Sequence, residues 1–180
     1  MPIYTRTGDT GSTSLFGGKR VLKCEELVDV YGSIDELNSW VGLLASQLNA
    51  ADVRQFLETV QSDLFTVGSS LAGSRIDLRV LDQRVKEMEA RIDALEKELP
   101  PIRNFILPGG NQLGAYIHLA RSVCRRVERQ TVALAQKNNV DSMIIKYLNR
   151  LSDLFFVLAR FINKQSETPE IIWKGNPAKS

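Results

Sequence analysis

The segment RSVCRRVERQ, residues 121–130, places four arginines and one glutamate within ten positions of an amphipathic helical pattern. At about 100° per residue, one stripe of this helix carries most of its charged side chains together with a histidine: His118, Arg121, Arg125, Glu128 and Arg129. Arg126 lies off this stripe. Because planar guanidinium groups offer paired donors that match phosphate oxygens, the stripe predicts a phosphate-binding face.

Two alternative roles fit the same stripe. Charged helix faces are usually just exposed to solvent, and the arginines could also pair with acids on a neighbouring helix or subunit, for which Asp35 and Asp153 are candidates. Phosphate binding is favoured because the stripe is nearly all of one sign, whereas an exposed face usually mixes signs, as residues 82–98 do. The residues alone leave all three roles open.

The N-terminal segment TRTGDTGSTSLFGGKR, residues 5–20, predicts a loop rich in glycine and in hydroxyl-bearing side chains. Such residues supply the backbone N–H and side-chain O–H donors that surround phosphate oxygens. Neither the GxxxxGK[ST] nor the GxGxxG spacing is present, so neither common nucleotide-binding fold is implied. Taken alone, a loop of this kind is more often a frayed chain end than a binding site.

Composition limits the class of protein. A chain of 180 residues with 43% hydrophobic and 24% charged residues has the size and composition of one globular domain. Its net charge of +2 argues against a nucleic-acid-binding protein. No apolar stretch suits a membrane span or a signal peptide, so we expect a cytoplasmic protein without a membrane partner. Two cysteines and one histidine argue against a disulfide framework and a histidine-based metal site.

Hydrophobic periodicity predicts the elements that must position these residues. Apolar side chains recur every three or four positions in five long segments, here given with their expected bounds: residues 26–48, 52–70, 81–99, 113–137 and 142–163. Short turns join most of them, and we find no strong strand signal. The predicted fold is all-α, an antiparallel five-helix bundle (25–165) with an N-terminal loop (1–24), a candidate phosphate-binding or nucleotide-binding loop, and a tail (166–180) within one domain.

Five blocks of sequence, in order, extend this interpretation: YTRTGDTGSTSLFGGKRVLK, YGSIDELNSWVG, FILPGG, HLARSVCRRVERQ and YLNRLSDLFFVLAR. Together they resemble the ATP:cob(I)alamin adenosyltransferases of the propanediol-utilisation type, the family of the human enzyme affected in methylmalonic aciduria type B. The resemblance covers residues 3–174. It implies a five-helix bundle, in agreement with the periodicity.

The resemblance also implies an activity and its substrates. Enzymes of this family transfer the 5′-deoxyadenosyl group of ATP, bound as Mg-ATP, to the cobalt of cob(I)alamin and release triphosphate. They are homotrimers with active sites between subunits. A cob(II)alamin reductase and an adenosylcobalamin-dependent enzyme are the further partners implied, and no side-chain metal ligand is predicted.

The family's nucleotide contacts carry over to two groups of residues in this sequence. In the N-terminal segment they are Thr5, Arg6, Thr7, Gly8, Asp9, Gly11, Thr13, Ser14 and Lys23. On the helices they are Arg125, Arg126, Glu128, Arg129 and Asn149. Thr10 departs from the pattern, because many relatives have lysine there, which leaves one phosphate contact in doubt.

On the corrinoid side, the resemblance pairs Asp35 with Arg121 across the subunit interface and makes Phe105 the aromatic side chain that displaces the lower ligand of cobalamin. With Arg125, these residues form the predicted catalytic set. Phe155 and Phe156 could help to exclude water from cobalt, although core packing accounts for them equally well.

Three remaining residues receive more ordinary roles. We expect His118 to be a packed or interface histidine and Cys124 to lie in the core. Trp173 could cap the corrinoid or anchor the tail. Two alternatives to the enzyme stay open, a nucleotide-binding helical sensor and a non-catalytic cobalamin carrier, and catalytic turnover separates the enzyme from both.

Overall fold

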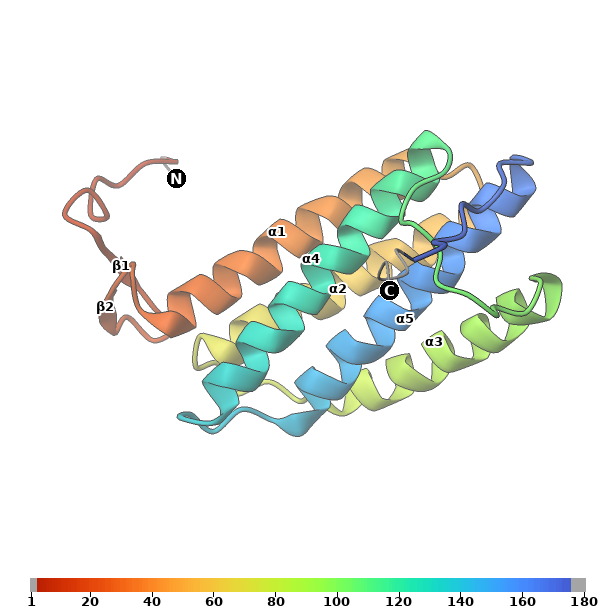
Figure 1. Ribbon diagram of the computed structural model, residues 1–180. Helices are drawn as coiled ribbons and strands as arrows, with labels where there is room; N and C mark the ends of the chain where they lie inside the picture. The colour runs from red at the N-terminus through yellow and green to blue at the C-terminus, as the bar shows by residue number, and fades with distance from the viewer. Residues whose placement is uncertain (1–2, 176–180) are drawn as a thin grey trace, which may run out of the picture.

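The computed structural model describes residues 3–175, and long helices dominate this range (Figure 1). The helices are α1 (Glu26–Gln47), α2 (Ala51–Leu71), α3 (Arg79–Glu98), α4 (Gln112–Ala135) and α5 (Ser142–Gln165). Each predicted helix is present, with bounds that differ from the prediction by at most two residues. Among residues 3–175, none of the helices combines the length and apolar character needed to cross a bilayer. The predicted all-α bundle is confirmed.

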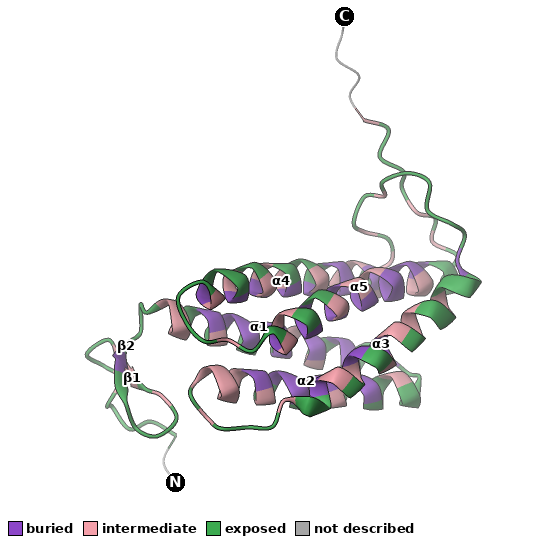
Figure 2. Ribbon diagram, turned by 90° about the horizontal axis from the view of Figure 1, so that it is seen from below, coloured by how far each residue is buried: buried purple, intermediate pink, exposed green. Residues whose placement is uncertain are grey.

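Helix α5 lies at the centre of the bundle, packed against α4 on one side and α3 on the other, while α1 packs against both α2 and α4. Its sequence explains this place, because a wide apolar arc covers more than one neighbour and leaves only a narrow polar stripe that includes Lys146, Arg150 and Asp153. Tyr147 and Phe155 are fully buried on it. Figure 2 shows the buried residues on the facing sides of the helices and the exposed ones outside.

The helix ends follow local sequence signals. Asp141 accepts a hydrogen bond from the Met143 amide (2.8 Å) at the start of α5, and Asn111 accepts one from the Gly114 amide (2.7 Å) at the start of α4. Both bonds satisfy amides that a first helical turn leaves unpaired. Helix α3 ends directly before Pro100-Pro101, as proline predicts.

The predicted absence of strands is wrong in one place. Residues of the N-terminal segment form an antiparallel hairpin of β1 (Ser12–Ser14) and β2 (Arg20–Leu22), in which Thr13 pairs with Val21. Strands of three residues are too short to show the alternating pattern that predicts them. The connecting turn depends on Gly17 and Gly18, both at φ +85°. The hairpin stands beyond the end of the helical bundle in both views (Figures 1 and 2).

A buried ionic network joins α2, α3 and α5. Arg84 Nε donates to Asp63 Oδ2 at 2.7 Å, and the Tyr147 hydroxyl lies 3.3 Å from the same oxygen. Burial raises the pKa of Asp63, and the hydrogen bond and charge of Arg84 oppose that rise. Because the Asp63 side chain is only 6% exposed, its charge depends on this arginine.

We therefore expect Arg84→Ala to lower the free energy of unfolding by about 3 kcal/mol, since it leaves a buried carboxylate without its partner. The matched control is Lys86→Ala two positions along α3, which removes an exposed pair with Asp82 and should lower the free energy of unfolding far less. Urea unfolding followed by circular dichroism measures both. Equal losses would contradict the role given to the buried pair.

Candidate active site

The arginine stripe of α4 opens into a groove of about 370 Å³ between α3, α4 and α5. Arg121 and Arg125 line it from α4, and Phe156 and Asp153 line it from α5. The structure thus brings two of the predicted catalytic residues into one cavity. The remaining lining residues are Ile92, Glu96, Arg150, Ser152 and Val157.

Two arginines that line this groove, Arg121 and Arg125, lack a salt-bridge partner among the described residues. Within residues 3–175, Arg121, Arg125 and Arg129 form no salt bridge. The Arg121 Nε atom is buried without a hydrogen-bond partner. Burial, with a smaller contribution from Arg125, lowers the pKa of Arg121. An anion in the groove would both neutralise the clustered arginine charge and accept a hydrogen bond from the buried Arg121 Nε. This favours phosphate binding over a face that is merely exposed to solvent.

Two acidic side chains nearby are engaged elsewhere, whereas Glu96 of α3 lines the groove and forms no salt bridge within residues 3–175. Asp153, one candidate partner, accepts from Arg150 Nη1 at 2.8 Å, and Arg150 also donates to Glu89 of α3 at 3.1 Å. Glu128 accepts from Asn149 Nδ2 at 2.9 Å, which places these two predicted nucleotide contacts together across α4 and α5. Asp153 therefore pairs with Arg150 and forms no salt bridge with Arg121 or Arg125.

Arg126 points away from this groove. Its guanidinium pairs with Glu36 and lies 3.4 Å from the Ser33 hydroxyl, both on α1. This agrees with its position off the stripe in the sequence. The structure of one chain thus separates Arg126 from Arg125 and Arg129, with which the family resemblance grouped it.

The N-terminal segment forms a preshaped, exposed turn. The Thr5 and Thr7 hydroxyls lie 2.8 Å apart, and the Lys23 amide donates to the Gly11 carbonyl at 2.9 Å. A Cβ atom at Gly8 would lie 3.2 Å from Lys23 Nζ, so glycine lets this ammonium group approach the backbone. Gly8 and Gly11 thus lie beside Lys23, and hydrogen bonds order the segment of predicted contacts.

Arg20 organises this turn, although no pattern in the sequence indicated such a role. Its guanidinium donates to the Thr7 carbonyl at 2.6 Å and to the hydroxyl groups of Ser12 and Ser14. Three residues, Arg20 to Leu22, are too few to show a strand pattern from which this position could have been inferred. Arg20 holds together the segment that carries the predicted phosphate donors.

One chain does not bring the N-terminal segment and the arginine groove together. Within residues 3–175, no hydrogen bond or salt bridge links residues 5–14 to α4 or α5. Asp35 is separated from Arg121 as well, since it lines a different hollow of about 360 Å³ between α1 and α2, beside Phe65. The predicted site residues therefore fall into separate groups on the surface of one chain.

Phe105 lies on the segment between α3 and α4, and its side chain is 79% exposed. Its ring meets Trp173 edge-on, with centroids 6.2 Å apart and planes at 71°. Phe155 is fully buried, so core packing accounts for it, whereas Phe156 faces the groove with its ring centroid 5.9 Å from Arg121 Cζ. Cys124 is fully buried, as predicted.

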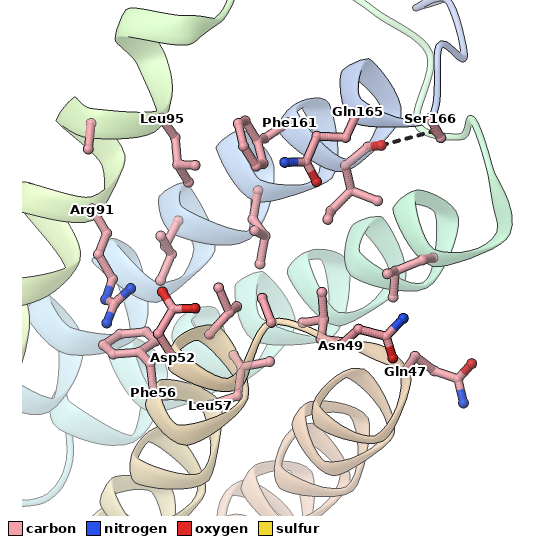
Figure 3. A pocket seen from close by; sticks show the side chains of 18 of the residues that line it. Gln47, Asn49, Asp52, Phe56, Leu57, Arg91, Leu95, Phe161, Gln165 and Ser166 are labelled. Carbon is pink, nitrogen blue, oxygen red and sulfur yellow. Dashed lines mark hydrogen bonds between the residues drawn. The ribbon is translucent and has the colours of Figure 1, made fainter.

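A separate apolar cavity of about 530 Å³ lies between α2, α3 and α5 and contains none of the predicted site residues (Figure 3). Arg91 crosses the ring of Phe56 at its rim, with Cζ 4.3 Å from the ring centroid. Its lining offers no group of convergent charges comparable to the arginine groove. We therefore place the candidate active site at the groove and not at this cavity.

Comparison with known proteins decides the family. The sequence profile described as cobalamin adenosyltransferase matches residues 3–162. This chain belongs to the cobalamin adenosyltransferase family. The resemblance seen in the five sequence blocks is therefore confirmed.

Named members of the family match this adenosyltransferase chain over most of its length. The corrinoid adenosyltransferase of Bacillus subtilis (strain 168) is 42% identical over 172 residues, covering 92% of this chain and 89% of its own. The corrinoid adenosyltransferase MMAB of Bos taurus is 39% identical over 185 residues, covering 97% and 76%.

Solved structures agree with the fold. A phenylalanine-to-alanine variant of the PduO-type ATP:corrinoid adenosyltransferase of Lactobacillus reuteri, complexed with cobalamin and ATP, superposes with a TM-score of 0.89 at 36% identity. The alignment covers 97% of this chain and all of that one. An arginine-to-lysine variant of the same enzyme, complexed with ATP, gives a TM-score of 0.87 at 35% identity, with 96% and 100% coverage.

His118 differs from the other residues of the predicted stripe. It is 4% exposed, its Nδ1 has no partner, and burial, followed by the charge of Arg121, lowers its pKa to about 4 despite the opposing charge of Glu170. At neutral pH it is an uncharged packing residue against Phe156, 6.2 Å between ring centroids. Its place on the charged stripe is thus corrected, and the expectation of a packed histidine holds.

The lowered pKa of His118 predicts a pH-dependent stability in this adenosyltransferase. Between about pH 6.5 and pH 4 the unfolded chain binds a proton that the folded chain does not, so acidification lowers the free energy of unfolding by up to about 1.4 kcal/mol per pH unit. Urea unfolding between pH 7 and 5 should show a steeper decline for the wild type than for His118→Asn. Identical slopes would show that His118 titrates normally.

Proposed function

We propose that this protein transfers the 5′-deoxyadenosyl group of ATP to the cobalt of cob(I)alamin, forming adenosylcobalamin and triphosphate. The observation that carries the proposal is the groove in which Arg121 and Arg125 have no salt-bridge partner within residues 3–175, in a chain of the cobalamin adenosyltransferase family. A polyphosphate is the anion that such a pair of guanidinium groups fits. The relatives from Lactobacillus reuteri are described as complexes with ATP.

The nucleotide site requires two copies of the chain in this proposal. The exposed turn around Lys23 and the groove at Arg125 do not meet within one chain, yet both present donors suited to phosphate oxygens. A neighbouring copy would place its turn over the groove, and Asp35 of one copy would meet Arg121 of the next. We therefore propose a homotrimer with its active sites between subunits, as the family resemblance implies.

The residues of the groove act by positioning and by electrostatics. Cob(I)alamin is a strong nucleophile, so the chain needs no activated serine or cysteine. As the Co–C5′ bond forms from the cobalt electron pair, the C5′–O bond breaks and triphosphate leaves with the electron pair of that bond. Arg125, Arg129 and Lys23 would meet the growing negative charge on triphosphate, together with the Mg²⁺ that ATP carries as part of the substrate.

Phe105 has a different task in this proposal. An external reductant supplies one electron to convert cob(II)alamin to cob(I)alamin, and an axial nitrogen ligand on cobalt makes that reduction harder. The exposed ring of Phe105, supported by Trp173, offers an apolar surface that would exclude the lower ligand and water. Phe156, beside Arg121 in the groove, is the better placed of the two helper candidates.

Several further assignments stay proposals. They are the individual nucleotide contacts, the division into loop, bundle and tail, cytoplasmic residence, and the use of a reductase and an adenosylcobalamin-dependent enzyme as partners. Trp173 contacts Phe105, which favours a position of Trp173 beside the corrinoid.

The direct test of the activity is an anaerobic assay with Mg-ATP and chemically reduced cobalamin, following loss of cob(I)alamin absorbance and formation of light-sensitive adenosylcobalamin. Absence of turnover by folded, ATP-binding protein would favour the sensor or the carrier.

Removing Arg125 should cripple the use of ATP. We expect Arg125→Ala to lower kcat/KM for ATP by roughly 100-fold or more, because it removes a charge whose interaction is stronger in the transition state than in the ground state. Size-exclusion chromatography should show an unchanged assembly. Arg79→Ala, which removes an exposed arginine paired with Asp77, is the control and should leave kcat/KM unchanged. A fall of less than about threefold in Arg125→Ala would remove Arg125 from the catalytic set.

Removing the ring of Phe105 should impair the reaction of the corrinoid without impairing the binding of ATP. We expect Phe105→Ala to bind ATP normally and to slow adenosylation from cob(II)alamin with a mild reductant by about tenfold or more. Ile102→Ala, an exposed apolar residue on the same segment, should leave this rate unchanged. Full activity of Phe105→Ala under these conditions would show that the ring does not displace the ligand.

A further inference from the structure

The segment that carries Phe105 is held mainly by the C-terminal tail. The Trp173 amide donates to the Phe105 carbonyl, and the Leu107 amide donates to the Ile171 carbonyl, each at 2.8 Å. Ile106 and Ile172 form the antiparallel bridge between these two extended segments. Because the Phe105 side chain is largely exposed, its direction depends on this backbone pairing more than on packing of the ring.

The tail is fixed in turn by one buried arginine of α5. Arg160 Nε donates to Glu170 Oε1 at 2.6 Å, and its Nη2 lies 3.3 Å from Glu170 Oε2, a two-pronged pairing. The Arg160 side chain is 4% exposed and that of Glu170 is 24% exposed. Such charge-assisted pairs have a defined geometry, so Glu170 is held in one place directly before the extended residues 171–173.

The guanidinium of Arg160 also binds the segment between α3 and α4 that carries Phe105. Arg160 Nη2 donates to the Pro100 carbonyl at 2.8 Å, where the chain leaves α3 and begins the segment that leads to Phe105. Arg160 therefore ties together the beginnings of both paired segments. Asn163, one turn later on α5, adds a second link, since its Nδ2 donates to the Gly109 carbonyl at 2.8 Å beyond Phe105.

We propose that Arg160 and Glu170 are positioning residues that set the rings of Phe105 and Trp173 against the corrinoid. Neither needs to touch the substrate. Their pair fixes the tail, the tail fixes the backbone of the Phe105 segment, and that backbone directs the ring toward the lower face of cobalt. This inference rests on the proposed function and adds to it the residues that hold its ligand-displacing group in place.

Positioning of this kind has a measurable scale. Displacement of a reacting or excluding group by about 1 Å can cost up to about 100-fold in rate. Loss of the Arg160–Glu170 pair should therefore lower the rate with cob(II)alamin by about tenfold or more. ATP binding should not change, because neither Arg160 nor Glu170 lines the groove that contains Arg125.

The tail partner is the better residue to change, since Glu170 lies outside the helical core. Glu170→Ala removes the pair, whereas Glu170→Gln keeps one acceptor for Arg160 and should retain part of the activity. Glu167→Gln is the matched control for Glu170→Gln, because Glu167 is an exposed acid on the same tail that forms no salt bridge within residues 3–175. Thermal unfolding of each variant checks that the bundle remains intact.

The decisive readout is the ligand state of cobalt in the protein complexed with Mg-ATP and cob(II)alamin. Electron paramagnetic resonance shows a splitting by the axial nitrogen when the lower ligand is bound. We expect that splitting to be largely lost in the wild type and in Glu167→Gln, and retained in Glu170→Ala. The KM for ATP should stay within about twofold while kcat with cob(II)alamin falls.

A second substrate separates positioning from general damage. Cobinamide lacks the lower nucleotide base, so only water and no nitrogen has to be excluded from cobalt, and Glu170→Ala should be less impaired with it than with cobalamin. An equal defect with both corrinoids, or ligand loss and turnover at wild-type levels in Glu170→Ala, would overturn the positioning role. Failure of the wild type to form adenosylcobalamin would instead count against the proposed function, so the two failures are distinguishable.

Discussion

The burial of α5 between α3 and α4 is the constraint on which the rest of the structure depends. The apolar arc of this helix is too wide for one neighbour to cover, so both α3 and α4 pack against it. That packing creates the groove lined by Arg121 and Arg125. It also sets Arg160 at the far end of the same helix, where it meets Glu170.

Charge is distributed unequally around this central helix. Arg84 and Asp63 neutralise each other where α2 and α3 meet, and Arg150 is matched by Asp153 and Glu89. The α4 arginines that face the groove have no such partner within residues 3–175. A protein gains nothing in stability from clustered like charges, so a ligand that brings negative charge accounts better for their arrangement.

Much of this could be predicted from the sequence. Helix bounds followed from the three-to-four-residue spacing of apolar side chains, because that spacing is a local property of the chain. The position of Arg126 outside the stripe could be predicted from its angle on the helix. The angle alone, however, put His118 among the charged residues, and packing against Phe156 made it a buried neutral side chain instead. Helical angle does not tell which neighbour covers a face.

The sequence by itself determined the helices, the concentration of arginine on α4 and the family to which the chain belongs, since these depend on residue types and short spacings. Only the tertiary structure decided which arginines are left unpaired, that Arg20 gathers the N-terminal turn, and that Arg160 links Pro100 to Glu170. The physical reason is that ion pairs and hydrogen bonds between distant segments depend on distance and direction in space. A single sequence does not contain that information in any local pattern.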